Sequence, residues 1–171
     1  MRTSILVLAA LSCLAGCNKD LVDSAEAKEG DKAEAKSKLK TVDLAPLPLT
    51  IEVKGGIGAM DMSIGKSHSV TVDTGDDASV NVSDAEFSFT ELKESYEKDT
   101  ILFPFKKWEK QDKKTAILQF VNEGKKGYIG LMAVEVGGKK YFCKTTGLDG
   151  MPSVDAAQKS LDWCKNLKAA K

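Results

Sequence analysis

Hydrophobic and polar residues alternate along several short stretches between residues 49 and 146. Alternation with a period of two is typical of strands that turn one face toward a core. Two other segments place apolar residues at helical spacing, one capped at Ser83 or Asp84 and running to about Asp99, the other from about Ser153 to Ala169. Strands are predicted over residues 49–54, 67–74, 78–83, 101–110, 115–121, 128–136 and 139–146, with a short one around 60–64.

The order of these elements is strands, a helix, more strands and a closing helix. Helices that are segregated from an antiparallel sheet in this way are typical of α+β domains. We therefore predict an α+β fold with an antiparallel sheet of about 6–7 strands, one internal helix and a C-terminal helix packed on it. The internal helix is expected to turn Phe89, Leu92 and Tyr96 to one side.

The most specific local prediction is a hairpin that turns at Gly137-Gly138. Two glycines adopt the positive φ angles that a two-residue hairpin turn requires. If Val136 pairs with Lys139, one face of the hairpin carries Met132, Val134, Val136, Tyr141 and Cys143. The last helix has a matching apolar face, formed by Val154, Ala157, Leu161, Cys164 and Leu167. The two faces meet if this helix packs on the hairpin.

The N-terminus has the pattern of an export signal. Met1-Arg2-Thr3 is short and basic, and residues 5–15 are almost wholly apolar. This combination is typical of the n-region and h-region of a secretory signal peptide. The apolar run is shorter than the roughly 20 residues that a transmembrane helix needs.

Leu14-Ala15-Gly16-Cys17 follows the apolar run and resembles a bacterial lipobox. The resemblance implies that the Cys17 thiol receives a diacylglyceryl group and that residues 1–16, including Cys13, are removed. It also implies that the new amine of Cys17 is acylated, with chains such as palmitate, and that the protein is lipid-anchored in the cell envelope. Asn18 after the cysteine favours the outer membrane of a diderm bacterium. The alternative is an ordinary secretory signal in which Cys17 stands by chance.

Residues 18–45 are rich in Ala, Glu, Lys, Asp and Ser and contain no aromatic residue. A segment of this composition buries too little apolar surface to offset its ordering entropy. We therefore predict a lipidated cysteine and flexible tether over residues 17–45, and a single globular domain over residues 46–171. The alternative is a partner-binding helix, because Glu34 and Lys38 form a favourable i,i+4 pair.

Two cysteines remain if Cys13 is removed and Cys17 is lipidated. Export places them in an oxidising compartment, so we predict a disulfide between Cys143 and Cys164. Closing a loop of about 22 residues stabilises a domain by roughly 3 kcal/mol. Three alternatives are weaker: a redox centre usually has C-x-x-C, a zinc site needs two further ligands, and a thiol nucleophile has only His68 as a candidate base.

No catalytic constellation, metal site or cofactor motif is recognised in the sequence. His68 is interpreted as an exposed histidine at a strand end, with a general base as the alternative. Asp73, Asp76, Asp77, Asp84 and Glu86 are interpreted as a solvated turn, with a calcium loop as the alternative, because their spacing does not follow the EF-hand series.

The glycine-rich stretch 55–65 lacks the spacing of a nucleotide-binding fingerprint. Met60 and Met62 share one strand face within it, which is more typical of a core or edge position than of a ligand cage.

Basic and acidic residues are equal in number, 25 of each, which argues against nucleic-acid binding. They are unevenly placed: residues 43–90 have two Lys and eight acidic residues, a net charge of −6, and residues 91–171 have sixteen Lys and eleven acidic residues, a net charge of +5. Lysine pairs stand at predicted strand ends, at 106–107, 113–114, 125–126 and 139–140. They are interpreted as protection of sheet edges against aggregation, and the alternative is a basic edge facing anionic lipid or cell-wall polymer.

The last 70 or so residues resemble small bacterial lipoprotein domains with a GGK-x-Y-x-C strand and a late helical cysteine. The matching residues are Gly137, Gly138, Lys139, Tyr141, Cys143 and Cys164. The element order also resembles the PsbP/Mog1 sandwich, a likeness that implies a fold and carries no activity.

These observations predict a lipid-anchored envelope protein, a non-enzymatic module that binds an envelope protein or polymer. The alternatives are a carrier for a small apolar ligand held between sheet and helix, and a hydrolase that uses carboxylates.

Overall fold

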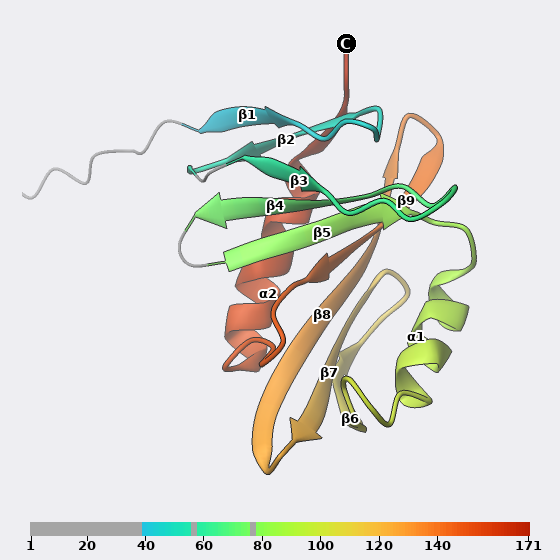
Figure 1. Cartoon of the computed structure of the whole chain (residues 1–171), viewed down its shortest axis with the longest axis vertical. Helices are drawn as coiled ribbons and strands as arrows, with labels where there is room; N and C mark the ends of the chain where they lie inside the picture. Colours follow the sequence, from blue (N-terminus) through green and yellow to red (C-terminus); the bar gives the residue numbers. More distant parts are fainter. Residues whose placement is uncertain (1–38, 56–57, 76–77) are drawn as a thin grey trace, which may run out of the picture. The chain divides into compact units, whose positions relative to one another are not determined.

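The computed structural model describes residues 39–55, 58–75 and 78–171 (Figure 1). The predicted signal peptide, Cys13, Cys17 and most of the predicted tether lie outside these residues. The helices are α1 (Phe89–Glu97), α2 (Val154–Asp162) and the short 3₁₀ helix η1 (Trp163–Asn166). The strands are β1 (Lys40–Asp43), β2 (Leu49–Val53), β3 (Ala59–Asp61), β4 (Ser69–Gly75), β5 (Ala78–Asp84), β6 (Phe105–Gln111), β7 (Thr115–Asn122), β8 (Lys125–Val136), β9 (Lys139–Thr145) and β10 (Leu167–Ala169).

The α+β class predicted from the sequence is confirmed. Seven strands form an antiparallel sheet in the order β3-β4-β5-β9-β8-β7-β6, and β1, β2 and β10 form a second sheet in the order β1-β2-β10. The smaller sheet was not predicted. Figure 1 shows α2 and α1 on opposite sides of the large sheet.

The two faces of the large sheet carry separate apolar cores. On the inner face, β2, α2 and η1 pack on residues such as Val72, Val82 and Tyr141, which are almost completely buried. On the outer face, α1 packs on a smaller core of four buried residues, Leu118, Phe120, Ile129 and Leu131. Because alternate residues of a strand point to opposite faces, both cores draw on the same strands.

The hairpin at Gly137-Gly138 has the predicted register. Val136 pairs with Lys139, Val134 with Tyr141, and Met132 with Cys143. Both glycines have positive φ angles, 60° and 80°, as the two-residue turn requires. The predicted apolar face of this hairpin and the predicted apolar face of the C-terminal segment lie together in the inner core.

The internal helix begins later than predicted. β5 continues through Ser83 and Asp84, so neither residue caps a helix. The cap is Ser88, whose hydroxyl accepts a hydrogen bond from the Glu91 backbone, while the Glu91 carboxylate accepts one from the Ser88 backbone. This reciprocal capping box fixes the start of α1. The predicted apolar side, Phe89, Leu92 and Tyr96, packs on the outer core.

The C-terminal helix is shorter than predicted. It ends at Asp162, passes through η1, and the chain then becomes β10, which pairs with β2. The buried side chain of Leu167 lies opposite Ile51, and the Asn166 side-chain amide donates to the Glu52 carbonyl at 3.2 Å. Pairing with a strand over a hundred residues earlier therefore outweighs the local helical pattern.

The folded part of the chain begins before residue 46, where the sequence placed its boundary. Residues 40–43 form β1, which pairs along β2, and the side chain of Leu44 is fully buried. Composition averaged over the predicted tether conceals the apolar residues Val42 and Leu44 at its end. None of the helices within the described residues is long and apolar enough to span a membrane.

Candidate functional site

On the outer face of the large sheet, α1 packs against residues of β6, β7 and β8. Farther along the same face, Thr71, Asn81 and Lys144 stand opposite one another in one polar row across β4, β5 and β9. A hollow of about 570 Å³ opens between this row and the part that α1 covers. We call it the outer hollow. This volume lies in the range of roughly 300–1,000 Å³ that is typical of small-molecule sites.

Apolar side chains surround the outer hollow. They come from the segment after β3, from α1 and the segment that follows it, from β8, and from the loop after β9: Met62, Ile64, Tyr96, Phe103, Ile129 and Leu148. Three of these large side chains are open to solvent, with exposed fractions of 51% for Met62, 83% for Ile64 and 83% for Leu148. Apolar groups that are exposed together around one hollow indicate a contact surface.

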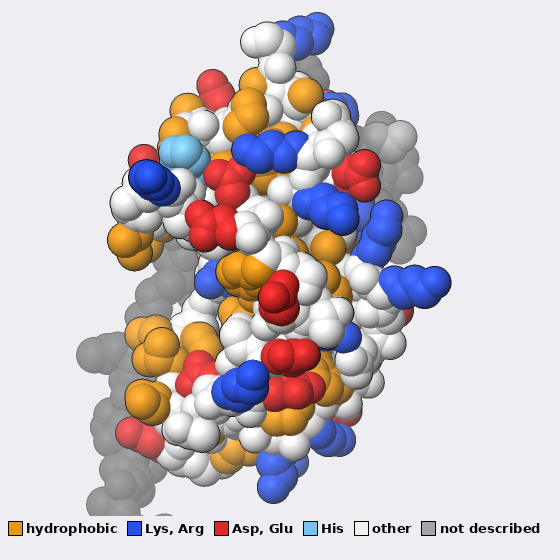
Figure 2. All heavy atoms as spheres, turned by 90° about the vertical axis from the view of Figure 1, so that its right-hand side faces the viewer, with side chains coloured by type: hydrophobic (Ala, Val, Ile, Leu, Met, Phe, Trp, Pro, Cys, Tyr) orange, Lys and Arg blue, Asp and Glu red, His pale blue; other side chains and the backbone are white. Residues whose placement is uncertain are grey.

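The side of the molecule that carries α1 is mixed in character. Figure 2 shows hydrophobic side chains at its surface among basic and acidic ones. Met60 is also exposed, and it lies opposite Thr71 on the edge strand β3. The sequence predicted that Met60 and Met62 lie either in the core or at a sheet edge, and the structure places them at the edge.

The polar floor of the outer hollow is held by hydrogen bonds between strands. The Asn81 side chain is only 7% exposed, and its amide nitrogen lies 2.8 Å from Ser69 Oγ and 3.0 Å from Thr71 Oγ1. A buried amide needs such partners, because leaving it unpaired costs about 1–3 kcal/mol. The floor is therefore a fixed polar platform on β4 and β5.

Lys144 is the only charged residue that lines the outer hollow within the described part of the chain. Its ammonium has no hydrogen bond and no ion-pair partner among those residues. The side chain of Lys144 is exposed to solvent, and the protein around it still lowers the pKa of its ammonium by partial desolvation. Among the residues that the structure describes, the outer hollow therefore has one positive charge and no counterion for it.

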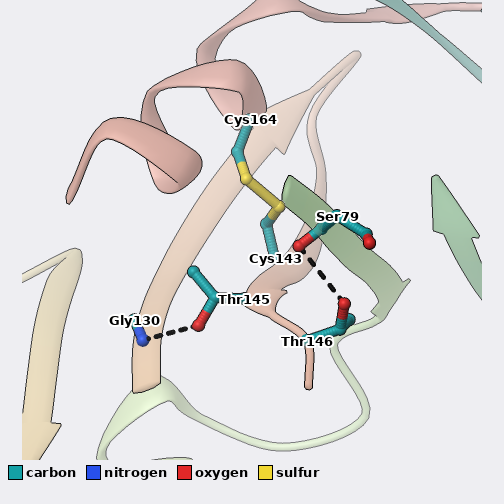
Figure 3. The surroundings of a disulfide bond; sticks show 6 residues. All are labelled: Ser79, Gly130, Cys143, Thr145, Thr146 and Cys164. Atoms are coloured by element: carbon teal, nitrogen blue, oxygen red, sulfur yellow. Dashed lines mark hydrogen bonds between the residues drawn. A yellow bond between two sulfur atoms is a disulfide. The ribbon is translucent and has the colours of Figure 1, made fainter. Parts of the chain in front are cut away.

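The predicted disulfide lies on the other side of the same strand. Cys143 and Cys164 are both fully buried, their sulfurs are 1.97 Å apart and their Cα atoms 6.3 Å apart, within the usual range for a disulfide. Figure 3 shows that the bond joins β9 to η1. Nearby, the Thr145 hydroxyl accepts a hydrogen bond from the Gly130 backbone at 3.0 Å, and the Thr146 hydroxyl donates to the Ser79 carbonyl at 3.3 Å.

The structure gives His68 a partner that the sequence did not suggest. Its Nδ1 lies 3.1 Å from Asp84 Oδ2, and Lys139 Nζ lies 2.8 Å from Asp84 Oδ1. Figure 2 shows the single histidine at the surface with acidic and basic side chains beside it. The His68 side chain is 45% exposed, in agreement with the predicted exposed position at a strand end, whereas that of Asp84 is 15% exposed.

Two opposing effects act on the Asp84 carboxylate. Desolvation by burial is the largest and raises its pKa, but the hydrogen bonds and charges of Lys139 and His68 together outweigh it. The net result is a pKa below the ordinary value of 3.8. The anion is therefore favoured in the folded state, where it joins the end of β5 to the β8–β9 turn.

We expect Asp84→Asn to lower the free energy of unfolding by about 1–2 kcal/mol at neutral pH, because two charge-assisted contacts are lost. Since the folded-state pKa is lowered, the stabilisation is fully present above pH 3.8 and is lost as pH falls through the lower folded-state value. Urea unfolding of both proteins between pH 7 and about pH 2 measures the difference. Asp149→Asn, in an exposed loop, is the control; a constant difference at all pH values would contradict the assignment.

The other acidic residues of the predicted turn do not gather around a cation. Asp73 Oδ1 accepts a hydrogen bond from the Gly75 backbone at 2.9 Å, while Asp76 and Asp77 lie outside the described residues. Within residues 39–55, 58–75 and 78–171, no group of three or more His, Cys, Asp or Glu side chains is placed to hold a metal ion.

Three of the four lysine pairs stand at turns or strand ends, as the sequence predicted. Lys113-Lys114 lies between β6 and β7, Lys125-Lys126 opens β8, and Lys139-Lys140 opens β9. Lys106-Lys107 lies within β6, which is an edge strand of the large sheet. Lysines on an edge strand hinder pairing with another sheet.

No family model, curated protein or solved structure matched this chain when it was compared with each of the three.

Proposed function

We propose that this chain is a lipid-anchored protein of the bacterial cell envelope whose folded part is a non-enzymatic binding module. In this proposal Cys17 carries the lipid and becomes the first residue of the mature protein. Two or three acyl chains hold a protein firmly on a bilayer, whereas one chain binds only marginally. The segment that follows Cys17 separates the membrane from the folded part, which begins at β1.

The buried disulfide between Cys143 and Cys164 is the observation that carries the proposal. Disulfides form and persist in oxidising compartments such as the periplasm and are rare in the cytosol of mesophiles. The bond therefore supports export, and the resemblance of Leu14-Ala15-Gly16-Cys17 to a lipobox supports retention at a membrane after export.

The outer hollow supports binding as the role of the folded part. It combines exposed apolar side chains, a fixed polar floor and Lys144, which has no counterion within the described part of the chain. Convergent polar groups within an apolar hollow are typical of ligand sites. The outer hollow is lined by the large sheet on one side and by Tyr96 of α1 and Phe103 on the other. A carrier that holds an apolar ligand between sheet and helix would bind it at such a place.

Replacing Cys17 tests the anchor. When the full chain is expressed in a diderm bacterium, we expect the wild type in the outer-membrane fraction and Cys17→Ser as a larger, unprocessed precursor outside that fraction. The reason is that serine offers no thiol for the diacylglyceryl group. Membrane fractionation and gel mobility measure both effects.

Cys13→Ser is the matched control, because Cys13 is expected to leave with the signal peptide. It is expected to behave as the wild type does. If Cys17→Ser gave a mature protein of the same size as the wild type in the outer-membrane fraction, the result would contradict a lipid anchor at Cys17.

A further inference from the structure

We propose that the outer hollow binds a single-chain amphiphile with one carboxylate, whose headgroup pairs with Lys144 and whose aliphatic chain lies against Met62, Ile64 and Leu148. This inference rests on the proposed role of the folded part as a binding module and names the chemistry of what it binds. The occupant is a free carboxylate amphiphile such as a fatty acid. Three features of the outer hollow support it.

The first feature is charge. Lys144 brings one positive charge to a hollow that has no carboxylate among its described lining residues. Removing water from an ammonium costs free energy, and the direction of its pKa change reflects that cost. A carboxylate from outside would give this ammonium a charge-assisted hydrogen bond, which is shorter and stronger than a bond between neutral groups. One cation matches one anion, which favours a monoanionic headgroup.

The second feature is the apolar surround. Met62, Ile64 and Leu148 come from two different loops, yet all three line the same hollow and expose half or more of their surface. Covering them with an aliphatic chain removes apolar surface from water. Methionine suits such a surface because its unbranched thioether adapts to ligands of different shape. A polar ligand would leave these three side chains in water.

The third feature is the rigidity of the floor between these two parts. Asn81 is hydrogen-bonded to Ser69 and Thr71, and it stands directly opposite Lys144 in the β5–β9 pairing. On the reverse side of β9, the disulfide at Cys143 ties the strand to η1. A floor that is ordered before the ligand arrives loses little conformational entropy on binding.

Photochemical labelling of the full-length protein in phosphatidylcholine vesicles tests the inference. The probe is a twelve-carbon carboxylic acid with a diazirine in its chain, and its methyl ester and its trimethylammonium analogue are the comparison probes. Peptide mass spectrometry locates the cross-links. We expect the acid to label the peptides that contain Met62, Ile64 and Leu148, and unlabelled dodecanoate to compete. The ester and the cation should label these peptides at least about fivefold less, because each lacks the charge-assisted pair.

Four variants sharpen the result. Lys144→Gln should lower acid labelling by about fivefold or more, while Lys144→Arg keeps the charge and should retain it. Lys140→Gln removes an exposed charge from the same strand, outside the outer hollow, and should leave labelling unchanged. Leu148→Ser should weaken labelling by acid and ester alike, because it removes apolar contact and no charge.

Equal labelling by acid and ester, cross-links spread over the surface, or no labelling at all would overturn the inference. So would a Lys144→Gln protein that labels as the wild type does. If thermal unfolding shows that Lys144→Gln does not fold, the inference is tested by comparing the three probes on the wild type and on Lys144→Arg. If the labelling experiment contradicts the ligand site, the test of the lipid anchor with Cys17→Ser is not affected. If the acid labels the outer hollow but the protein carries no lipid, the ligand site is supported and the anchor is not.

Discussion

Phe120→Ala is expected to lower the free energy of unfolding by about 3–5 kcal/mol, the usual cost of removing a buried phenylalanine. Phe120 is 1% exposed and is one of the four buried residues that form the outer core within the described part of the chain. Its ring meets that of Phe103 edge-on, with centroids 5.1 Å apart. Because Phe103 lines the outer hollow, the substitution should also weaken labelling by the acid probe.

Two glycines explain why the space left by Phe120 would not close easily. A Cβ atom at Gly127 would lie 2.4 Å from the Phe120 ring and 2.4 Å from the Asp149 carbonyl oxygen, and one at Gly150 would lie 2.6 Å from the same ring. The backbone thus comes close to the ring at two positions. Gly127 pairs directly with Phe120 in the ladder between β7 and β8, so its backbone cannot move inward freely.

Urea unfolding of wild type and Phe120→Ala measures the cost. Phe87→Ala is the matched control, because Phe87 is 46% exposed, and it should cost about 1 kcal/mol or less. A loss below about 1 kcal/mol for Phe120→Ala would mean that the outer core contributes far less than its burial suggests.

Removing the disulfide is expected to cost about 3 kcal/mol in the double variant Cys143→Ala/Cys164→Ala. The two cysteines are 21 positions apart, and the bond limits the freedom of the unfolded chain over that loop. A change of this size should lower the melting temperature by roughly 10 °C for a folded part of this length.

The reduced wild type provides the control for this prediction. With an excess of reductant, the wild type should unfold close to the double variant, while the variant itself should not respond. If reductant left the unfolding of the wild type unchanged at all temperatures, the two cysteines would not be bonded in solution and the support for export would be lost.

Local sequence patterns determined much of the fold. The register around Gly137-Gly138 followed from turn chemistry and alternation alone, and the apolar face from Val154 to Leu167 identified what packs on it. Turn type and side-chain period are properties of neighbouring residues, so one sequence suffices for them. The pairing of Cys143 with Cys164 needed more than these patterns: it also used the expected removal of Cys13, the lipidation of Cys17 and export to an oxidising compartment.

Contacts between distant segments were not predictable in this way. β10 becomes a strand because it meets β2, and nothing near Leu167 signals that partner. β1 was assigned to the tether because its composition resembles that of the residues before it, although Val42 and Leu44 already mark apolar positions. Long-range pairing overrides weak local preferences in both cases.

The outer hollow was missed for the same reason. Alternation places Lys144 on the face opposite Cys143, but it does not reveal that a hollow opens beside Lys144 or that Leu148 and Ile64 line it. The one available signal was the pair Met60 and Met62, one in the short edge strand β3 and one just after it, both of which are exposed.

The intact mass of the mature protein, purified from the envelope of a diderm bacterium, bears most directly on the lipid anchor. We predict a chain that starts at Cys17 and carries the added mass of a diacylglyceryl group and an amide-linked acyl chain, with the mass loss of one disulfide. A chain with an unmodified N-terminus at another residue would contradict the anchor, whatever the outer hollow binds.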